Sequence, residues 1–261
     1  MTRETLILVG REATSAVLER HAARLRERDV VDTVTTATYG TEPAFDLAEP
    51  FRAHEADRTY VVPMCFAHTY ETTEDVPQAL SELSGEVRYC DPVGESPAVT
   101  EILRERAAET HEEDADDGSD DEADALLLVA LGNSSDDYGR DAAEYHAERL
   151  RSDFEEVRTA YLLQSPAVEC ARYTLDHDSA VVVPLFVAEC EATRTGIPEK
   201  LELDRGGFEY AEPFGSGAQL TEAIHAEVER ERVLADRDSE TAGTDLVADA
   251  RPVATDGRGQ D

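Results

Sequence analysis

Two short stretches of the sequence combine residue types that bind metals and move protons. They span residues 61–77 and 182–198, and the candidate side chains in them are His68, Glu71, Glu189 and Glu191. Imidazole and carboxylate groups bind divalent ions such as Co²⁺ and Fe²⁺, and both act as general bases once they are positioned. We predict that His68 and Glu71 are catalytic and that His68 binds metal together with the two glutamates of the second stretch.

The two stretches are copies of one pattern at a constant spacing. Each has an apolar run, a proline, a few more apolar residues and a polar loop that ends in a second proline. Pro63 corresponds to Pro184, and Thr100 corresponds to Thr221 at the same shift of 121 residues. A buried strand that opens into a loop at its carboxyl end has this pattern. Several anchors matched in one order predict an internal duplication.

Strand and helix patterns alternate through both halves of the chain. The expected strands are residues 6–10, 31–39, 60–66 and 86–90, and then 126–131, 157–162, 180–187 and 208–211. Such alternation predicts parallel sheets that are covered on both faces. The predicted fold is therefore α/β, with two tandem lobes that each hold a parallel sheet of about four strands flanked by helices. Ligands bind beyond the carboxyl ends of such strands, so we expect the candidate loops to line one cleft between the lobes.

Charge and composition divide the chain further. We expect a first lobe over residues 1–110, an acidic disordered linker over 111–123, a second lobe over 124–232 and a disordered acidic tail over 233–261. The linker has a block of like charges and no aromatic residue, and the tail has little periodicity.

The overall charge excludes some functions. Aspartate and glutamate number 59 against 24 lysines and arginines, which gives a net charge of −35. No basic field exists to collect phosphates, so we expect no nucleic-acid partner. The balance is typical of salt-accumulating halophiles, because at about 1 M salt the Debye length is ~3 Å and self-repulsion is screened. The apolar runs are too short for export or membrane spanning, so we expect a cytoplasmic protein with free thiols and no membrane partner.

Several of these segments together resemble a known family. They are the opening Leu6–Gly10, the two Val-Val-Pro loops, the turn Thr41–Phe45 and the segment Val87–Gly94. The chain is similar to the class II chelatases, specifically the sirohydrochlorin cobaltochelatases of the CbiX type, over residues 4–110 and 124–230. The resemblance implies insertion of Co²⁺, or Fe²⁺ or Ni²⁺ in some relatives, into a tetrapyrrole without ATP, in cobalamin or sirohaem synthesis. The metal is then a substrate, no cofactor is expected, and the partner is a sirohydrochlorin-like tetrapyrrole.

The sequence departs from the family pattern at two places. The family usually follows its first strand with Gly-His-Gly-Ser, whereas the matching positions here are 10–13 and 130–133, and neither has the histidine. Many members also carry a histidine at the position that Glu71 occupies here. Three functions therefore stay open: an ATP-independent chelatase, a degenerate paralogue that binds tetrapyrrole or metal as a carrier or partner subunit, and an α/β protein that binds an unrelated small molecule.

A site for a macrocycle rich in carboxylates should present arginines and backbone N–H groups. The candidates for substrate binding are Arg11, Arg194, Gly10, Gly94 and Gly132. The run from Gly132 to Ser135 is alternatively a phosphate cradle, although it lacks the lysine of a P-loop. His21 and His146 recur at equivalent positions of two helix patterns, and we expect them to have surface or packing roles.

Overall fold

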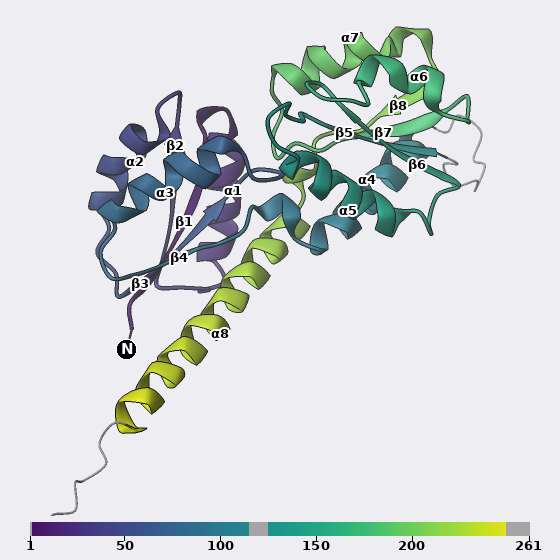
Figure 1. Cartoon of the computed structure of the whole chain (residues 1–261). Coiled ribbons are helices and arrows are strands. Elements are labelled where there is room, and N and C mark those ends of the chain that lie inside the picture. The colour runs from purple at the N-terminus through teal and green to yellow at the C-terminus, as the bar shows by residue number, and fades with distance from the viewer. Residues whose placement is uncertain (1, 115–124, 249–261) are drawn as a thin grey trace, which may run out of the picture.

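The structure is a computed structural model that describes residues 2–114 and 125–248. These residues form two α/β lobes that lie beside each other in Figure 1, with a long helix running from one to the other. Each lobe holds one sheet of four parallel strands. The predicted fold class is confirmed.

The first sheet has the strand order β2-β1-β3-β4. Its strands are β1 (Glu4–Arg11), β2 (Thr33–Tyr39), β3 (Arg58–Pro63) and β4 (Glu86–Tyr89). The helices connecting them are α1 (Ser15–Arg26), α2 (Pro43–Arg52) and α3 (Val76–Ala79). β3 is buried along its whole length, as a central strand covered on both faces must be.

The second sheet repeats this order as β6-β5-β7-β8. Its strands are β5 (Ala125–Ala130), β6 (Glu156–Tyr161), β7 (Ala180–Pro184) and β8 (Phe208–Tyr210), and its helices include α5 (Tyr138–Leu150), α6 (Ala171–Thr174) and α7 (Ile197–Leu201). Val9 lies opposite Pro63 in the first sheet, and Val129 lies opposite Pro184 in the second. The same register at the same proline confirms the duplication.

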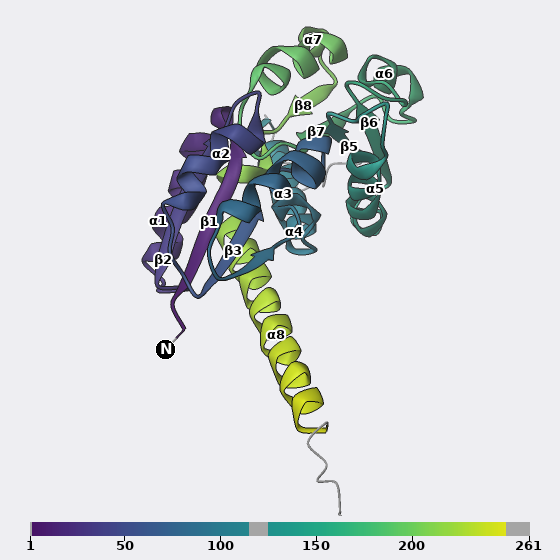
Figure 2. The same cartoon turned by 60° about the vertical axis from the view of Figure 1, so that its left-hand side comes forward.

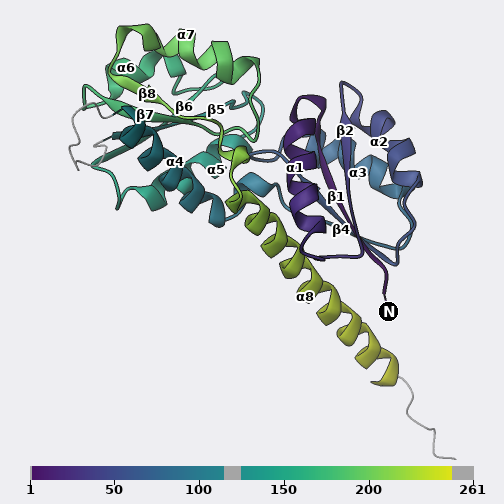
Figure 3. The same cartoon turned by 180° about the vertical axis from the view of Figure 1, so that it is seen from behind.

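The two repeats exchange their last helices. α4 (Ala98–Asp114) ends the first repeat but packs against β7, β8 and α5 of the second lobe. α8 (Gln219–Ala248) ends the second repeat but packs against α1 and β3 of the first lobe. Figures 1 and 3 show α4 under the second sheet and α8 alongside α1. Packing therefore crosses the predicted division at residue 110, because each sheet is covered by a helix of the other repeat.

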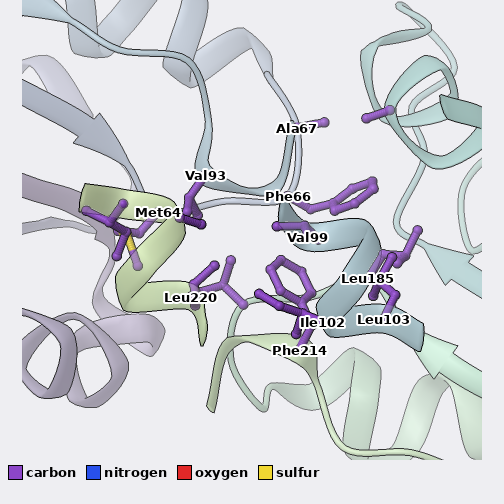
Figure 4. Packing of buried hydrophobic residues seen from close by; sticks show 14 of the residues in the cluster. Met64, Phe66, Ala67, Val93, Val99, Ile102, Leu103, Leu185, Phe214 and Leu220 are labelled. Atoms are coloured by element: carbon purple, nitrogen blue, oxygen red, sulfur yellow. The ribbon is translucent and has the colours of Figure 1, made fainter. Parts of the chain in front are cut away.

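One continuous core joins the two lobes as a result. Val99, Ile102 and Leu103 on one face of α4 are buried in the same apolar cluster as Leu220 of α8, and this spacing is that of an amphipathic helix. The rings of Phe66 and Phe214, one from each repeat, meet edge to face with centroids 6.1 Å apart in this cluster (Figure 4). The outer face of each sheet has a smaller cluster of its own under α2 and α3 or α7.

Helices α4 and α8 continue into both segments that we expected to be disordered. α4 continues through residues 111–114, and the remainder of the predicted linker lies outside the described residues. α8 continues to Ala248, well beyond residue 233, and in Figure 2 its far end extends past the first lobe. Tertiary contacts explain the longer helix, because Ala235 is fully buried and Asp236 pairs with Arg58 at 3.1 Å. Residues 249–261 of the predicted tail are not described.

No helix within residues 2–114 and 125–248 has both the length and the apolar character needed to cross a bilayer.

Candidate active site at the carboxyl ends of the two sheets

The loop that follows the third strand is built in the same way in both lobes. A π-helical turn, Glu71–Asp75 in the first lobe and Ala192–Gly196 in the second, leads into α3 or α7. Inside it Thr72 accepts the Thr69 N–H at 2.8 Å, and Thr193 accepts the Cys190 N–H at 3.0 Å. Such turns are rare and occur mostly at functional sites. The copies differ at the position three residues before the turn, which is His68 in one and Glu189 in the other.

His68 is held at two points and lies half-buried in this loop. Its backbone N–H donates to the Glu95 carboxylate at 3.0 Å, and its Nδ1 lies 3.2 Å from the Thr72 hydroxyl. Among the described residues, none hydrogen-bonds Nε2 of His68. Because Thr72 can donate its own hydroxyl proton to the Thr69 carbonyl at 3.1 Å, its oxygen is able to accept Nδ1–H. In that arrangement Nε2 carries a lone pair that can bind a metal or accept a proton.

The ring of His68 meets a residue of the other lobe. Tyr138, at the start of α5, lies edge to face with it, with ring centroids 6.0 Å apart. The loop after β3 and the segment after β5 therefore meet at these two rings. Tyr138 is 46% exposed, and Leu131, which follows β5, is 45% exposed. Sequence reasoning missed Tyr138, because the second copy has a longer segment between its first strand and helix, and the first copy offers no matching aromatic residue.

The predicted arginine and glutamate residues pair within each lobe. Arg11, at the end of β1, forms an ion pair with Glu71, and the side chains are 58% and 23% exposed. In the second lobe Arg194 pairs with Glu189 at 3.1 Å, with both side chains more than half exposed. Arg11 and Glu71 therefore lie together near the loop that carries His68, as a site for an anionic substrate requires.

The predicted metal ligands are not gathered into one set. Within the part of the chain that the structure describes, no three histidine, cysteine, aspartate or glutamate residues lie close enough to share an ion. Glu189 faces Arg194, and Glu191 is exposed at the start of its π-helical turn. His68 thus stands apart from the two glutamates with which we expected it to bind metal.

Burial keeps the thiol of Cys65, in the loop of His68, protonated. Cys65 precedes His68 in the same loop, and burial, followed by the charges of Glu95 and Glu71, raises the pKa of Cys65 to about 12. The side chain stays a neutral thiol at neutral pH, and only the thiolate is a good metal ligand. Burial also raises the pKa of Tyr39, which lies near Glu71 and Arg11. Neither the Cys65 thiol nor the Tyr39 hydroxyl loses its proton near neutral pH.

The predicted substrate-binding glycines have other roles. Gly10 is buried inside β1 opposite Thr38. Gly94 is buried, and a Cβ atom there would lie 2.2 Å from the Phe66 carbonyl oxygen. Its own N–H donates to the Cys65 carbonyl at 3.0 Å, so no donor is left for a substrate. Both glycines are thus at packing positions, because a Cβ atom at Gly10 would lie 2.6 Å from Thr14 Oγ1 and one at Gly94 would meet the Phe66 backbone.

Gly132 instead opens a polar hollow in the second lobe. Its φ of +70° falls in the left-handed region that favours glycine. The hollow beyond it has a volume of about 660 Å³ and is lined by residues 133–137, Arg140, 162–165 and Ala167. Arg140 is the basic residue among these, and its Nη2 donates to the Ser165 carbonyl at 2.8 Å, while its Nε is buried without a partner. Asp136 and Asp137 share the wall, which argues against a phosphate cradle at this place.

Known proteins resemble this chain in sequence and in fold. A curated relative in Halobacterium salinarum, named a probable sirohydrochlorin cobaltochelatase, is 28% identical over 229 residues, which are 75% of this chain and 76% of the relative. The solved structure of CbiX, described as the terminal enzyme of sirohaem biosynthesis in denitrifying bacteria, matches with a TM-score of 0.66 and 19% identity over 87% of this chain and 99% of that one.

Two further solved structures have the same fold. The sirohydrochlorin chelatase SirB of Bacillus subtilis subspecies spizizenii, in complex with cobalt, matches with a TM-score of 0.65 and 15% identity over 87% of this chain and 94% of that one. A multi-domain protein of Deinococcus radiodurans with structural similarity to chelatases matches with a TM-score of 0.67 and 21% identity over 87% of this chain, which spans only 54% of that protein. The CbiX family model itself matches residues 9–110 and 125–231, the two halves of the duplication, and the chain therefore belongs to the CbiX family.

Proposed function

We propose that this protein is an ATP-independent chelatase that inserts Co²⁺ into a sirohydrochlorin-like tetrapyrrole. The observation that carries the proposal is the position of His68, whose Nε2 has no hydrogen-bond partner among the described residues and whose ring lies against Tyr138 of the opposite lobe. Family membership and the likeness to a probable sirohydrochlorin cobaltochelatase support the substrate class.

Insertion requires a ligand for the incoming ion and a base for the two pyrrole protons. His68 supplies the ligand or the base through Nε2, with Thr72 holding Nδ1. Glu71 is the nearby carboxylate that assists it, and imidazole and carboxylate suit Co²⁺. Arg11, now paired with Glu71, receives a carboxylate of the macrocycle. When it does so, the Glu71 carboxylate is released from the ion pair and is free to contact the incoming substrate.

The walls for a flat macrocycle come from both lobes. Tyr138 and Leu131 are exposed apolar side chains at the carboxyl edge of the second sheet, and Tyr70 is 65% exposed beside His68 in the first. Large apolar side chains that remain in water at such an edge are typical of a binding surface. Arg140, in the hollow next to Tyr138, can receive a second carboxylate of the same ligand.

A second candidate function is tetrapyrrole binding without turnover, as a carrier or partner subunit. It is favoured by the absence, among the described residues, of a group of three metal-binding side chains. It also fits the Glu189–Arg194 ion pair, which occupies two residues that were expected to reach the substrate.

One optical titration separates the two functions. Metal-free sirohydrochlorin is mixed with the protein in molar KCl, with and without Co²⁺, and the Soret band is followed. A chelatase accelerates the metal-dependent spectral change over a no-protein control, and His68→Ala abolishes the acceleration while the binding shift remains. A carrier gives the binding shift with no acceleration. No shift and no acceleration would refute both functions.

A further inference from the structure

Two buried histidines link the lobes in a symmetric pair. His21 in α1 lies 2.8 Å from the Thr221 hydroxyl and 2.9 Å from the Gly215 carbonyl oxygen. His146 in α5 lies 2.8 Å from the Thr100 hydroxyl and 2.9 Å from the Gly94 carbonyl oxygen. Both histidines are fully buried, so the packing role expected from the sequence is confirmed. In each case both partners come from the other repeat.

The carbonyl partner fixes the tautomer of each ring. A carbonyl oxygen can only accept, so Nε2 of His146 donates to Gly94, and Nδ1 then accepts the Thr100 hydroxyl proton when the ring is neutral. Burial keeps the ring neutral, since it lowers the pKa of His146 to about 4. His146 is therefore a fixed donor to the turn at Gly94 over the whole neutral range.

That turn holds the loop of His68. Gly94 donates its N–H to the Cys65 carbonyl at 3.0 Å, and the next residue, Glu95, accepts the His68 N–H at 3.0 Å. Phe66, between these two contacts, has its ring 6.0 Å from the ring of His146. A short path of contacts thus runs from His146 in the second lobe through Gly94 and Glu95 to the backbone of His68.

The other lobe lacks the last step of this path. His21 binds Gly215 in the same way, but Ser216 occupies the position that corresponds to Glu95. The carboxylate that holds the backbone of His68 therefore has no counterpart in the second repeat. Replacing either histidine removes an equivalent pair of hydrogen bonds. Only His146 is also connected to the backbone of His68, a candidate catalytic residue.

We infer that His146 is a positioning residue for His68, which it places from the opposite lobe through the turn at Gly94 and Glu95. The expected effect of His146 on the reaction rate rests on the proposed catalytic role of His68. The placement itself can be measured without turnover. α5 then has two functions in the site, because it also presents Tyr138 to the ring of His68.

The test compares His146→Leu with His21→Leu in the full chain. Histidine-labelled protein in molar KCl is examined by NMR at one fixed pH, and the His68 signal is assigned from its loss in His68→Ala. We expect His146→Leu to move the ring chemical shifts of His68, and His21→Leu to leave them unchanged. If the protein is a chelatase, kcat should fall by about tenfold in His146→Leu, equal to ~1.4 kcal/mol, with KM nearly unchanged.

A second pair of variants covers the case in which a leucine variant does not fold. His146→Gln keeps an N–H donor for Gly94 and should restore the His68 signal, whereas the shorter His146→Asn should not. Equal changes of the His68 signal in His146→Leu and His21→Leu would overturn the inference, and so would an unchanged signal in His146→Leu or in His146→Asn. A moved signal in a protein that shows no insertion would refute the proposed function and leave the inference standing.

Discussion

Arg232, in α8, places its guanidinium 2.7 Å from the carboxylate of Glu4, at the start of β1. The same guanidinium donates to the Val30 carbonyl at 2.8 Å. Both charged side chains are mostly buried, at 24% and 16% exposed. The last helix of the second repeat is therefore fastened to the first sheet by a desolvated ion pair as well as by apolar packing.

Replacing Arg232 by Gln should destabilise the protein by about 1–3 kcal/mol, because it leaves the Glu4 carboxylate buried with less compensation. Thermal unfolding at fixed molar salt measures the change. Arg205→Gln is the matched control, since the Arg205–Glu202 pair is about half exposed and should contribute less than ~0.5 kcal/mol. Similar losses in both variants would show that the contact of α8 with Glu4 does not contribute.

Stability should fall as the pH is lowered from 6.5 towards 4. Burial lowers the pKa of His146 from its ordinary value of 6.5 to about 4, so over this window the unfolded chain binds a proton that the folded chain does not. The loss from this residue is on the order of 3 kcal/mol and is complete near pH 4. Denaturant titrations at several pH values measure it. His146→Gln has no such group, so its stability should depend less steeply on pH; parallel curves would contradict the assignment.

Thr72→Val should alter the site, whereas Thr193→Val should not. Both threonines are buried and make the same hydrogen bonds to their own turns, so both variants should lose similar stability. Only Thr72 also contacts a histidine ring, at Nδ1 of His68. The rate of metal insertion should therefore fall in Thr72→Val alone, because the His68 ring loses the contact that orients it. If the rate falls in Thr193→Val as well, a general loosening of the loops is the cause.

Tyr138→Ala should weaken tetrapyrrole binding by about 5- to 30-fold, because an aromatic contact at such a site contributes roughly 1–2 kcal/mol. Fluorescence or Soret titration measures the affinity. Tyr173 is 76% exposed and serves as the control, because it belongs to α6, which lies on the side of the second lobe away from the first lobe in Figure 1. Tyr173→Ala should bind as the unaltered protein does. Equal affinity of both variants would place the macrocycle elsewhere.

Local patterns were sufficient to predict the sheets. The Val-Val-Pro runs, the constant spacing between the copies and the apolar opening of each half predicted all eight strands and the duplication. These features depend on side-chain periodicity within short segments, which the sequence displays directly. The predicted correspondence of Pro63 and Pro184 is confirmed, because Val9 and Val129 lie opposite them at the same register in the two sheets.

The features that the sequence did not predict depend on packing between residues far apart in the chain. The face of α4 reads as that of an ordinary amphipathic helix, and nothing in its periodicity reveals that the partner sheet belongs to the other repeat. For the same reason His146 read as a packing residue, while its connection to His68 passes through two residues of the other lobe. Gly94 looked like an exposed loop glycine, and the closeness of Phe66 became visible only in three dimensions.

Because α4 and α8 change places, neither half of the chain can lose its structure alone. Withdrawing α8 would open the inner face of the first sheet to water, and this would also disturb α4, against which α8 packs. Heat or denaturant should therefore remove both sheets in a single cooperative transition, although the molecule has the outline of two separate bodies.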